Sequence, residues 1–165
     1  LFEQASELTR LVSQEATLLM DKTSLAKPNV DRYPERALKE ALGNALAHRD
    51  YRLHDPTRVT AFADRVEFHS PGGLPMRMSL AQLRQGRVGP QWRNQTLAWV
   101  FMKLGLAQGE GQGLTTMRDL MKATGSPAPH FDASEVSVTC TLYAHRTSAK
   151  VRAATRRGKK KGSRG

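Results

Sequence analysis

Hydrophobic and polar positions repeat with two periods along the chain, and these periods predict its helices and strands. Apolar residues at helical spacing predict one helix within residues 2–20 and a second from Pro34 to about His48. Two short alternating runs, RVTAFAD and RVEFHS, predict a β-hairpin, and the alternation in EVSVTCTLYAH predicts a further strand. Three more helices are predicted for LAQLRQG, for NQTLAWVFMKLGL with Asn94 as its cap, and for LTTMRDLMKAT. This order predicts an α+β fold with helices packed on one face of a mostly antiparallel sheet.

The second predicted helix carries a polar stripe beside its apolar face. In ALKEALGNALAHRDY, the residues Glu40, Asn44 and His48 follow one another at a spacing of four, which places them along one side of the helix. A carboxylate can take a proton from water, and an amide oxygen one turn away can bind a hard cation such as Mg²⁺. Gly43 costs about 1 kcal/mol relative to alanine in a helix, which is explained if a ligand approaches closely. The same spacing is common on solvent-exposed helices, and His48 is expected to be structural.

Two glycine-rich loops favour the ligand-binding interpretation of this helix. SPGGLP places Gly72 and Gly73 at the end of a predicted strand, where a ligand can approach the backbone. GEGQG directly precedes a helix, so its backbone N–H groups lie at the positive end of the helix dipole and can bind a phosphate. In isolation, GEGQG is explained equally well as a flexible connection. Neither loop matches the dinucleotide-binding or the P-loop fingerprint.

The composition excludes several classes of protein and of site. The length of 165 residues is that of one domain, and no stretch approaches the roughly 20 apolar residues of a membrane span. The single cysteine, Cys140, excludes an internal disulfide and a multi-cysteine metal site. The five histidines are scattered, without a close pair that would suggest a metal ligand set. A cytoplasmic location is the natural expectation.

The net charge of +11 is concentrated at the end of the chain. Residues 146–165, RTSAKVRAATRRGKKKGSRG, contain nine Lys and Arg and no acidic residue, and the rest of the chain is close to neutral. Such a segment is either a solvated disordered tail or an electrostatic contact to nucleic acid. The residues expected to carry a contact of this kind are Arg156, Arg157, Lys159, Lys160 and Lys161.

Four segments of the chain, taken in order, resemble a known domain: YPERALKEALGNALAHRDY, RVEFHSPGGLP, RNQTLAWVFMKLGLAQGEGQGLTTM and EVSVTCTLY. It is the C-terminal ATP-binding-like domain of bacterial and archaeal transcriptional regulators that carry an Alba/Schlafen-type DNA-binding domain and are often labelled RecG-helicase-like. That domain is in turn similar to the GHKL superfamily, which includes gyrase and the histidine kinases. The resemblance covers roughly residues 30–145 and implies a two-layer α/β sandwich of the Bergerat (GHKL ATPase) type.

The resemblance also implies a role for each motif residue. Glu40 matches the general base of the gyrase-type members, and Asn44 matches their Mg²⁺ ligand. Gly72 and Gly73 match the loop beside the adenine. The glycines that match the phosphate-contacting end of the ATP lid are Gly109, Gly111 and Gly113.

The resemblance departs from the superfamily at the position that reads the adenine amino group. The superfamily has an Asp there, and the equivalent position here is His69 or Ser70. The nearest carboxylates are Glu67, within the strand, and Asp64, in the hairpin turn. The chain therefore carries most of the motif residues of the superfamily and lacks its adenine-reading carboxylate.

The sequence leads to an expected organisation and two expected functions. Residues 1–29 are expected to be a helix and linker from an upstream domain, residues 30–145 the GHKL-like domain, and residues 146–165 a basic tail. The first function is that of an ATP-binding, Mg²⁺-dependent regulatory domain of a DNA-binding transcriptional regulator, with DNA bound by the upstream domain or the tail. The second is that of a non-catalytic dimerisation or interaction module with a degenerate nucleotide site. The sequence does not decide whether the domain hydrolyses ATP weakly or whether it forms a homodimer, and no membrane partner is expected.

Overall fold

The computed structural model describes residues 2–16, 19–20, 29–30, 32–86, 89, 91–105 and 112–145. The helices are α1 (Phe2–Glu15), α2 (Glu35–Ala47), α3 (Leu80–Gln85), α4 (Gln95–Lys103) and α5 (Gly113–Ala123). The strands are β1 (Leu19–Met20), β2 (Asn29–Val30), β3 (Arg58–Ala61), β4 (Arg65–Pro71), β5 (His130–Ala133) and β6 (Ser137–Tyr143). Of the predicted features, Gly109, Gly111 and the basic tail lie outside these ranges.

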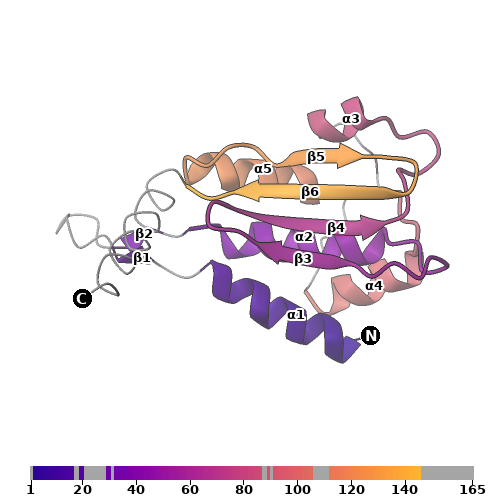
Figure 1. Ribbon diagram of the computed structural model, residues 1–165, viewed down its shortest axis with the longest axis horizontal. Coiled ribbons are helices and arrows are strands. Elements are labelled where there is room, and N and C mark those ends of the chain that lie inside the picture. Colours follow the sequence, from indigo (N-terminus) through magenta and orange to yellow (C-terminus); the bar gives the residue numbers. More distant parts are fainter. Residues whose placement is uncertain are drawn as a thin grey trace, which may run out of the picture.

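Four strands form one antiparallel sheet in the order β3-β4-β6-β5 (Figure 1). The two central strands, β4 and β6, pair over their full length of seven residues, from Arg65 opposite Tyr143 to Pro71 opposite Ser137. β1 and β2 form a separate short antiparallel pair. The last strand of the described chain therefore lies inside the sheet, beside a strand that precedes it by about seventy residues.

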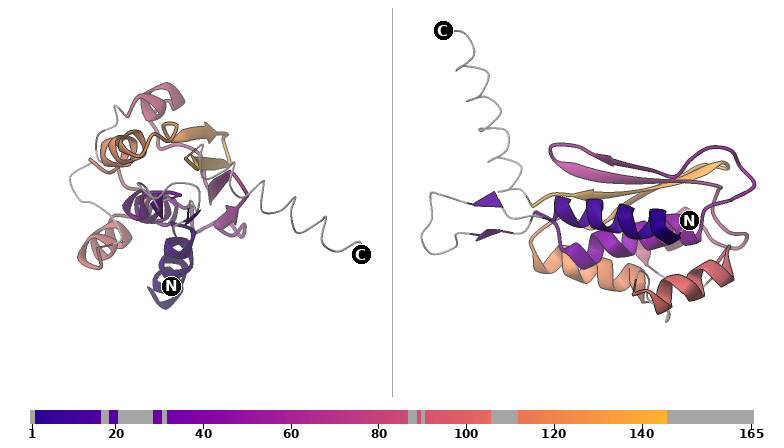
Figure 2. Two further views of the ribbon diagram at one scale, coloured as in Figure 1. Left: turned by 90° about the vertical axis from the view of Figure 1, so that its left-hand side faces the viewer. Right: turned by 90° about the horizontal axis from the view of Figure 1, so that it is seen from below.

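The helices α1, α2, α4 and α5 all lie on one side of this sheet, as Figure 2 shows in its right-hand view. Strand alternation explains this arrangement because successive side chains point to opposite faces. Val66 and Phe68 of β4 face the helices opposite Leu142 and Cys140 of β6, and all four side chains are buried. The other face carries polar residues such as Glu67, so only one face of the sheet requires a covering layer.

The hydrophobic core lies between the sheet and α2, whose apolar side is almost fully buried. Ala37, Leu38, Ala41 and Leu42 are each at most 2% exposed. α1 packs on the same core through Ala5 and Val12, at 1% and 4% exposure. Among the helices of the described ranges, none is long and apolar enough to cross a membrane.

The structure confirms the predicted α+β fold with helices on one face of a mostly antiparallel sheet. It differs from the predicted elements in several places. α1 ends at Glu15, and Leu19–Met20, at the end of the predicted helical range, form β1 instead. β2 and β5 were not predicted at all. Asn94 occupies the N-cap position of α4, but its side chain makes no capping hydrogen bond there and points instead to the end of α2.

Candidate functional site

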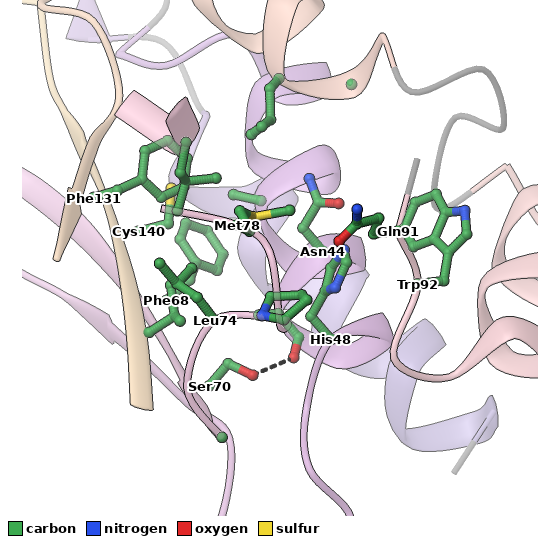
Figure 3. A pocket seen from close by; sticks show the side chains of 18 of the residues that line it. Asn44, His48, Phe68, Ser70, Leu74, Met78, Gln91, Trp92, Phe131 and Cys140 are labelled. Carbon is green, nitrogen blue, oxygen red and sulfur yellow. Dashed lines mark hydrogen bonds between the residues drawn. The ribbon is translucent and has the colours of Figure 1, made fainter. Parts of the chain in front are cut away.

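A cavity lies between α2, the end of β4 and the start of α5 (Figure 3). It reaches the protein surface beside Gly89 and Gln91, which are both exposed. Its volume is about 120 Å³. For comparison, an engineered protein cavity of about 150 Å³ binds benzene, so the enclosed space here is that of a small planar ring.

The predicted site residues within the described ranges all line this one cavity. They come from three parts of the chain that are far apart in the sequence: α2, the loop after β4, and the first turn of α5. These residues are Glu40, Asn44, Gly72, Gly73 and Gly113. His48, which the sequence favoured as structural, also lines the cavity.

Glu40 and Asn44 form a hydrogen-bonded pair on the cavity side of α2. The side-chain Nδ2 of Asn44 donates to Oε1 of Glu40 at 2.9 Å, and Glu40 is only 5% exposed. This leaves the amide oxygen of Asn44 without a hydrogen bond from any described residue. That oxygen is a hard donor of the kind that Mg²⁺ prefers.

The first residue of α5 is in close contact with the same carboxylate. A Cβ atom at Gly113 would overlap Oε1 of Glu40, so only glycine fits there without a shift of Glu40. Because a helix N-terminus carries a partial positive charge, it stabilises a carboxylate in this position. The end of the cavity near α5 therefore joins an amide oxygen, a carboxylate and a helix N-terminus, which together can bind a phosphate and its cation.

Gly72 and Gly73 are explained by contacts with the protein's own chain. Gly72 has φ +102°, and a Cβ there would lie 2.8 Å from Cβ of Asp50. At Gly73, a Cβ would lie 2.5 Å from the carbonyl oxygen of Glu135. The glycines therefore let this loop pack between the end of α2 and the β5–β6 turn. From the sequence, the two glycines were expected to let a ligand approach, and the structure adds this packing reason.

The strand register distinguishes between the two positions left open for base recognition. Ser70 is buried, lines the cavity, and donates its hydroxyl hydrogen to the carbonyl oxygen of Ala45 at 2.7 Å (Figure 3). His69 points to the other face of the sheet, where it contacts Oγ1 of Thr139 at 3.2 Å. Glu67 pairs with Arg65 on that outer face as well. Glu40 is the one carboxylate among the described residues that line the cavity.

Two aromatic rings form one wall of the cavity, and neither of them was predicted to belong to the site. The rings of His48 and Trp92 stack with centroids 5.1 Å apart and an interplanar angle of 23°. Burial and the nearby charge of Arg93 lower the pKa of His48 to about 4, so this imidazole is neutral at physiological pH. Trp92 follows a segment without helix or strand pattern, so no sequence signal connects it to α2.

The opposite wall is apolar. Phe68, Met78, Phe131 and Cys140 all line it, from β4, the following loop, β5 and β6 (Figure 3). Burial raises the pKa of the Cys140 thiol to about 12, so the thiol stays protonated. An apolar wall facing an aromatic one, with polar groups at one end, is typical of a site for a small planar molecule.

The lowered pKa of the half-buried His48 imidazole predicts a loss of stability in mild acid. His48 stays neutral in the folded protein down to about pH 4, whereas in the unfolded chain it takes up a proton near pH 6.5. Above pH 6.5 the imidazole is neutral in both states, so it does not lower the free energy of unfolding. As the pH falls from 6.5 toward 4, the unfolded chain takes up the proton first, and the free energy of unfolding decreases by on the order of 3 kcal/mol. Urea unfolding at pH 7 and pH 4.5 measures this change.

In the variant His48→Gln the decrease between the two pH values should be smaller than in the parent. His54→Gln, on an exposed loop, is the matched control and should keep the parent's pH dependence. Equal decreases for the parent and His48→Gln would contradict the assignment.

The described ranges contain no group of three or more His, Cys, Asp or Glu side chains that could hold a metal ion. Mg²⁺ commonly binds through one or two protein oxygens together with phosphates and waters.

Comparison with known proteins gives one family and one solved structure of interest. Residues 54–142 match the family described as "Putative ATP-dependent DNA helicase recG C-terminal". The DIP2311 protein of Corynebacterium diphtheriae has a similar structure, with a TM-score of 0.74 and 25% sequence identity. The similarity covers 87% of this chain and 29% of that protein, so the chain spans less than a third of the length of DIP2311. No curated protein matches the chain. Because the family match covers more than half of its residues, the chain belongs to the RecG C-terminal family.

Proposed function

We propose that this domain is of the Bergerat (GHKL ATPase) type and that it binds ATP with Mg²⁺ in the cavity, as the regulatory domain of a DNA-binding transcriptional regulator. One observation carries the proposal: a single cavity, with space for a planar ring, is lined by residues of three separate motifs, which are Glu40, Asn44, Gly72, Gly73 and Gly113. The family description, which names an ATP-dependent enzyme, supports the choice of nucleotide.

The base would lie between the apolar wall and the His48–Trp92 wall. Ser70 gives its hydroxyl hydrogen to Ala45, so its oxygen can still accept a hydrogen bond from the amino group of a base. A hydroxyl is a weaker acceptor than a carboxylate, because hydrogen bonds to charged groups are roughly twice as strong. We therefore expect weaker binding of adenine than in a domain that carries Asp at this position.

The phosphates would lie near Asn44, Glu40 and the N-terminus of α5. Mg²⁺ bound with the nucleotide would neutralise phosphate charge beside the buried carboxylate. The amide oxygen of Asn44 would contact this cation, and Glu40 would accept a proton from water if hydrolysis occurs. Gly109 and Gly111 are proposed phosphate contacts from the sequence resemblance alone.

The two tryptophans of the chain provide a direct test of binding. Trp92 lines the cavity, whereas Trp99 on α4 is 56% exposed and lies outside it. In the variant Trp99→Phe, Trp92 is the only tryptophan, and titration with Mg-ATP should change its fluorescence to saturation. Calorimetry on the same variant should give a matching dissociation constant.

The reciprocal variant, Trp92→Phe, keeps only Trp99 and should show no such fluorescence change. If Trp99→Phe gave neither a fluorescence change nor heat with millimolar ATP or other nucleoside triphosphates, nucleotide binding by this domain would be disproved.

A second candidate function is an interaction module with a degenerate nucleotide site. Ser70 supports it, since the adenine-reading carboxylate of the superfamily is missing from the cavity. In this case the titration above would fail, and the chain would act by dimerising and by binding nucleic acid through Arg156, Arg157, Lys159, Lys160 and Lys161. Comparing DNA affinity with and without residues 146–165, over a range of salt concentrations, tests the role of the tail.

A further inference from the structure

The two residues in front of α4 are bound to the C-terminal end of α2. Nδ2 of Asn94 donates to the carbonyl oxygens of Ala47 at 3.0 Å and of Arg49 at 2.7 Å. Nε of Arg93 donates to the carbonyl oxygen between them, that of His48, at 3.0 Å. Three consecutive carbonyl groups at the end of α2 therefore accept hydrogen bonds from two neighbouring side chains.

This arrangement satisfies groups that a helix cannot satisfy itself. The last carbonyl groups of an α-helix have no partner within the helix, and they carry its negative dipole end. A guanidinium group is suited to this position because it is always charged and holds its donors in a fixed plane. The contacts of Arg93 and Asn94 therefore fix where α2 ends.

The same guanidinium group also reaches the glycine loop. Nη2 of Arg93 donates to the carbonyl oxygen of Gly73 at 2.7 Å, and Nη1 lies 3.4 Å from Oδ2 of Asp50. Asp50 is bound in turn to the end of β4 through its backbone N–H, which donates to the carbonyl oxygen of Pro71 at 2.8 Å. Hydrogen bonds from Arg52, together with the charge of Arg93, hold the pKa of Asp50 well below its usual range, so the carboxylate stays charged.

We infer that Arg93 and Asn94 are positioning residues for the cavity: they hold the end of α2, the glycine loop and Trp92 in the geometry that a ligand requires. Neither of the two residues is among those that line the cavity. Trp92 directly precedes Arg93, so the contact of Arg93 with His48 also places the indole against the imidazole ring. The inference rests on the proposed function for its ligand, but its effect on Trp92 can be measured without one.

The test uses the full chain with the Trp99→Phe substitution as the parent. Arg93→Ala should weaken Mg-ATP binding at least about tenfold, because several hydrogen bonds that fix the two walls are lost together. It should also increase the quenching of Trp92 by acrylamide in the absence of nucleotide. Arg93→Lys should restore little of either property, since an ammonium group cannot reach three acceptors in a plane.

Arg32→Ala is the matched control for a structural effect. Arg32 also donates to backbone carbonyls, those of Phe62 at 2.5 Å and Ala63 at 2.8 Å, and neither it nor these two residues line the cavity. This variant should lower the melting temperature while the affinity and the quenching of Trp92 stay at parent values.

The outcomes are distinguishable from a failure of the proposed function. If the parent binds no nucleotide, the proposed function fails, and the quenching of Trp92 alone decides whether Arg93 positions the wall. If Arg93→Ala does not fold, Asn94→Ala replaces it, because it removes only the two hydrogen bonds to Ala47 and Arg49. A folded variant with the quenching and affinity of the parent would overturn the inference.

Discussion

The substitution Gly72→Ala should lower the free energy of unfolding by about 3 kcal/mol. Two costs combine at this position. The backbone has φ +102°, a conformation that costs a residue with a side chain about 1–3 kcal/mol. The added methyl group would also lie 2.8 Å from Cβ of Asp50 and 3.2 Å from its backbone nitrogen, an overlap that costs about 1–3 kcal/mol. Urea unfolding followed by circular dichroism measures the sum.

Two other glycines separate these costs. Gly105 has φ +69°, but a methyl group there would meet no atom within 4 Å, so Gly105→Ala should show the backbone cost alone, about 1 kcal/mol. Gly89 has neither a positive φ nor a neighbour within 4 Å, so Gly89→Ala should be close to neutral. If Gly72→Ala were as stable as Gly89→Ala, the close packing of the loop against Asp50 would be wrong.

The substitution Asn44→Ala should remove nucleotide binding, with a loss of affinity on the order of a hundredfold or more. Two contributions are lost together: the amide oxygen proposed to contact Mg²⁺, and the hydrogen bond that Nδ2 donates to Glu40. Losing a donor to a buried carboxylate costs about 1–3 kcal/mol, and the negative charge of Glu40 is then less well compensated beside a phosphate. Calorimetry and Trp92 fluorescence with Mg-ATP measure the loss.

Neighbouring variants on the same helix separate the role of Asn44 from that of the helix. Lys39→Ala changes a partly exposed side chain that pairs with Glu35 and should leave the affinity unchanged. Glu40→Gln should retain nucleotide binding and lose any hydrolysis, since an amide cannot accept the proton of water. Glu35→Gln, at an exposed position of the same helix, is its matched control. An Asn44→Ala variant that binds Mg-ATP as tightly as the parent would exclude Asn44 from the site.

The sequence predicted those parts of the fold that have a regular hydrophobic pattern. The apolar side of α2 and the alternation of β4 and β6 were visible in single segments, and each of these elements forms where it was predicted. The spacing of four between Glu40 and Asn44 correctly placed them on one side of α2, where they meet in a hydrogen bond. Local periodicity was sufficient because each of these elements buries a single face.

The remaining features depend on contacts between distant segments. β5 consists of four residues, HFDA, without a strong alternation, and it forms because β6 offers a free edge. In the sequence Asn94 resembles an ordinary helix cap. Its amide group instead donates to the carbonyl oxygens of Ala47 and Arg49, which precede it by 47 and 45 residues. The choice between His69 and Ser70 required the register of β4, since neighbouring residues of a strand point to opposite faces.

The position of β6 has a consequence for how the chain folds during synthesis. β4 and β5 do not pair with each other, and both are held in the sheet by β6, which follows them in the sequence. The sheet can therefore close only after residues 137–143 have left the ribosome. Until then Val66 and Phe68 lack the strand that completes their layer, and the emerging chain exposes apolar surface of the kind that chaperones bind. A nascent chain stalled before residue 137 should be recognised as unfolded, although it already contains all the helices of the described ranges and three of the four strands of the sheet.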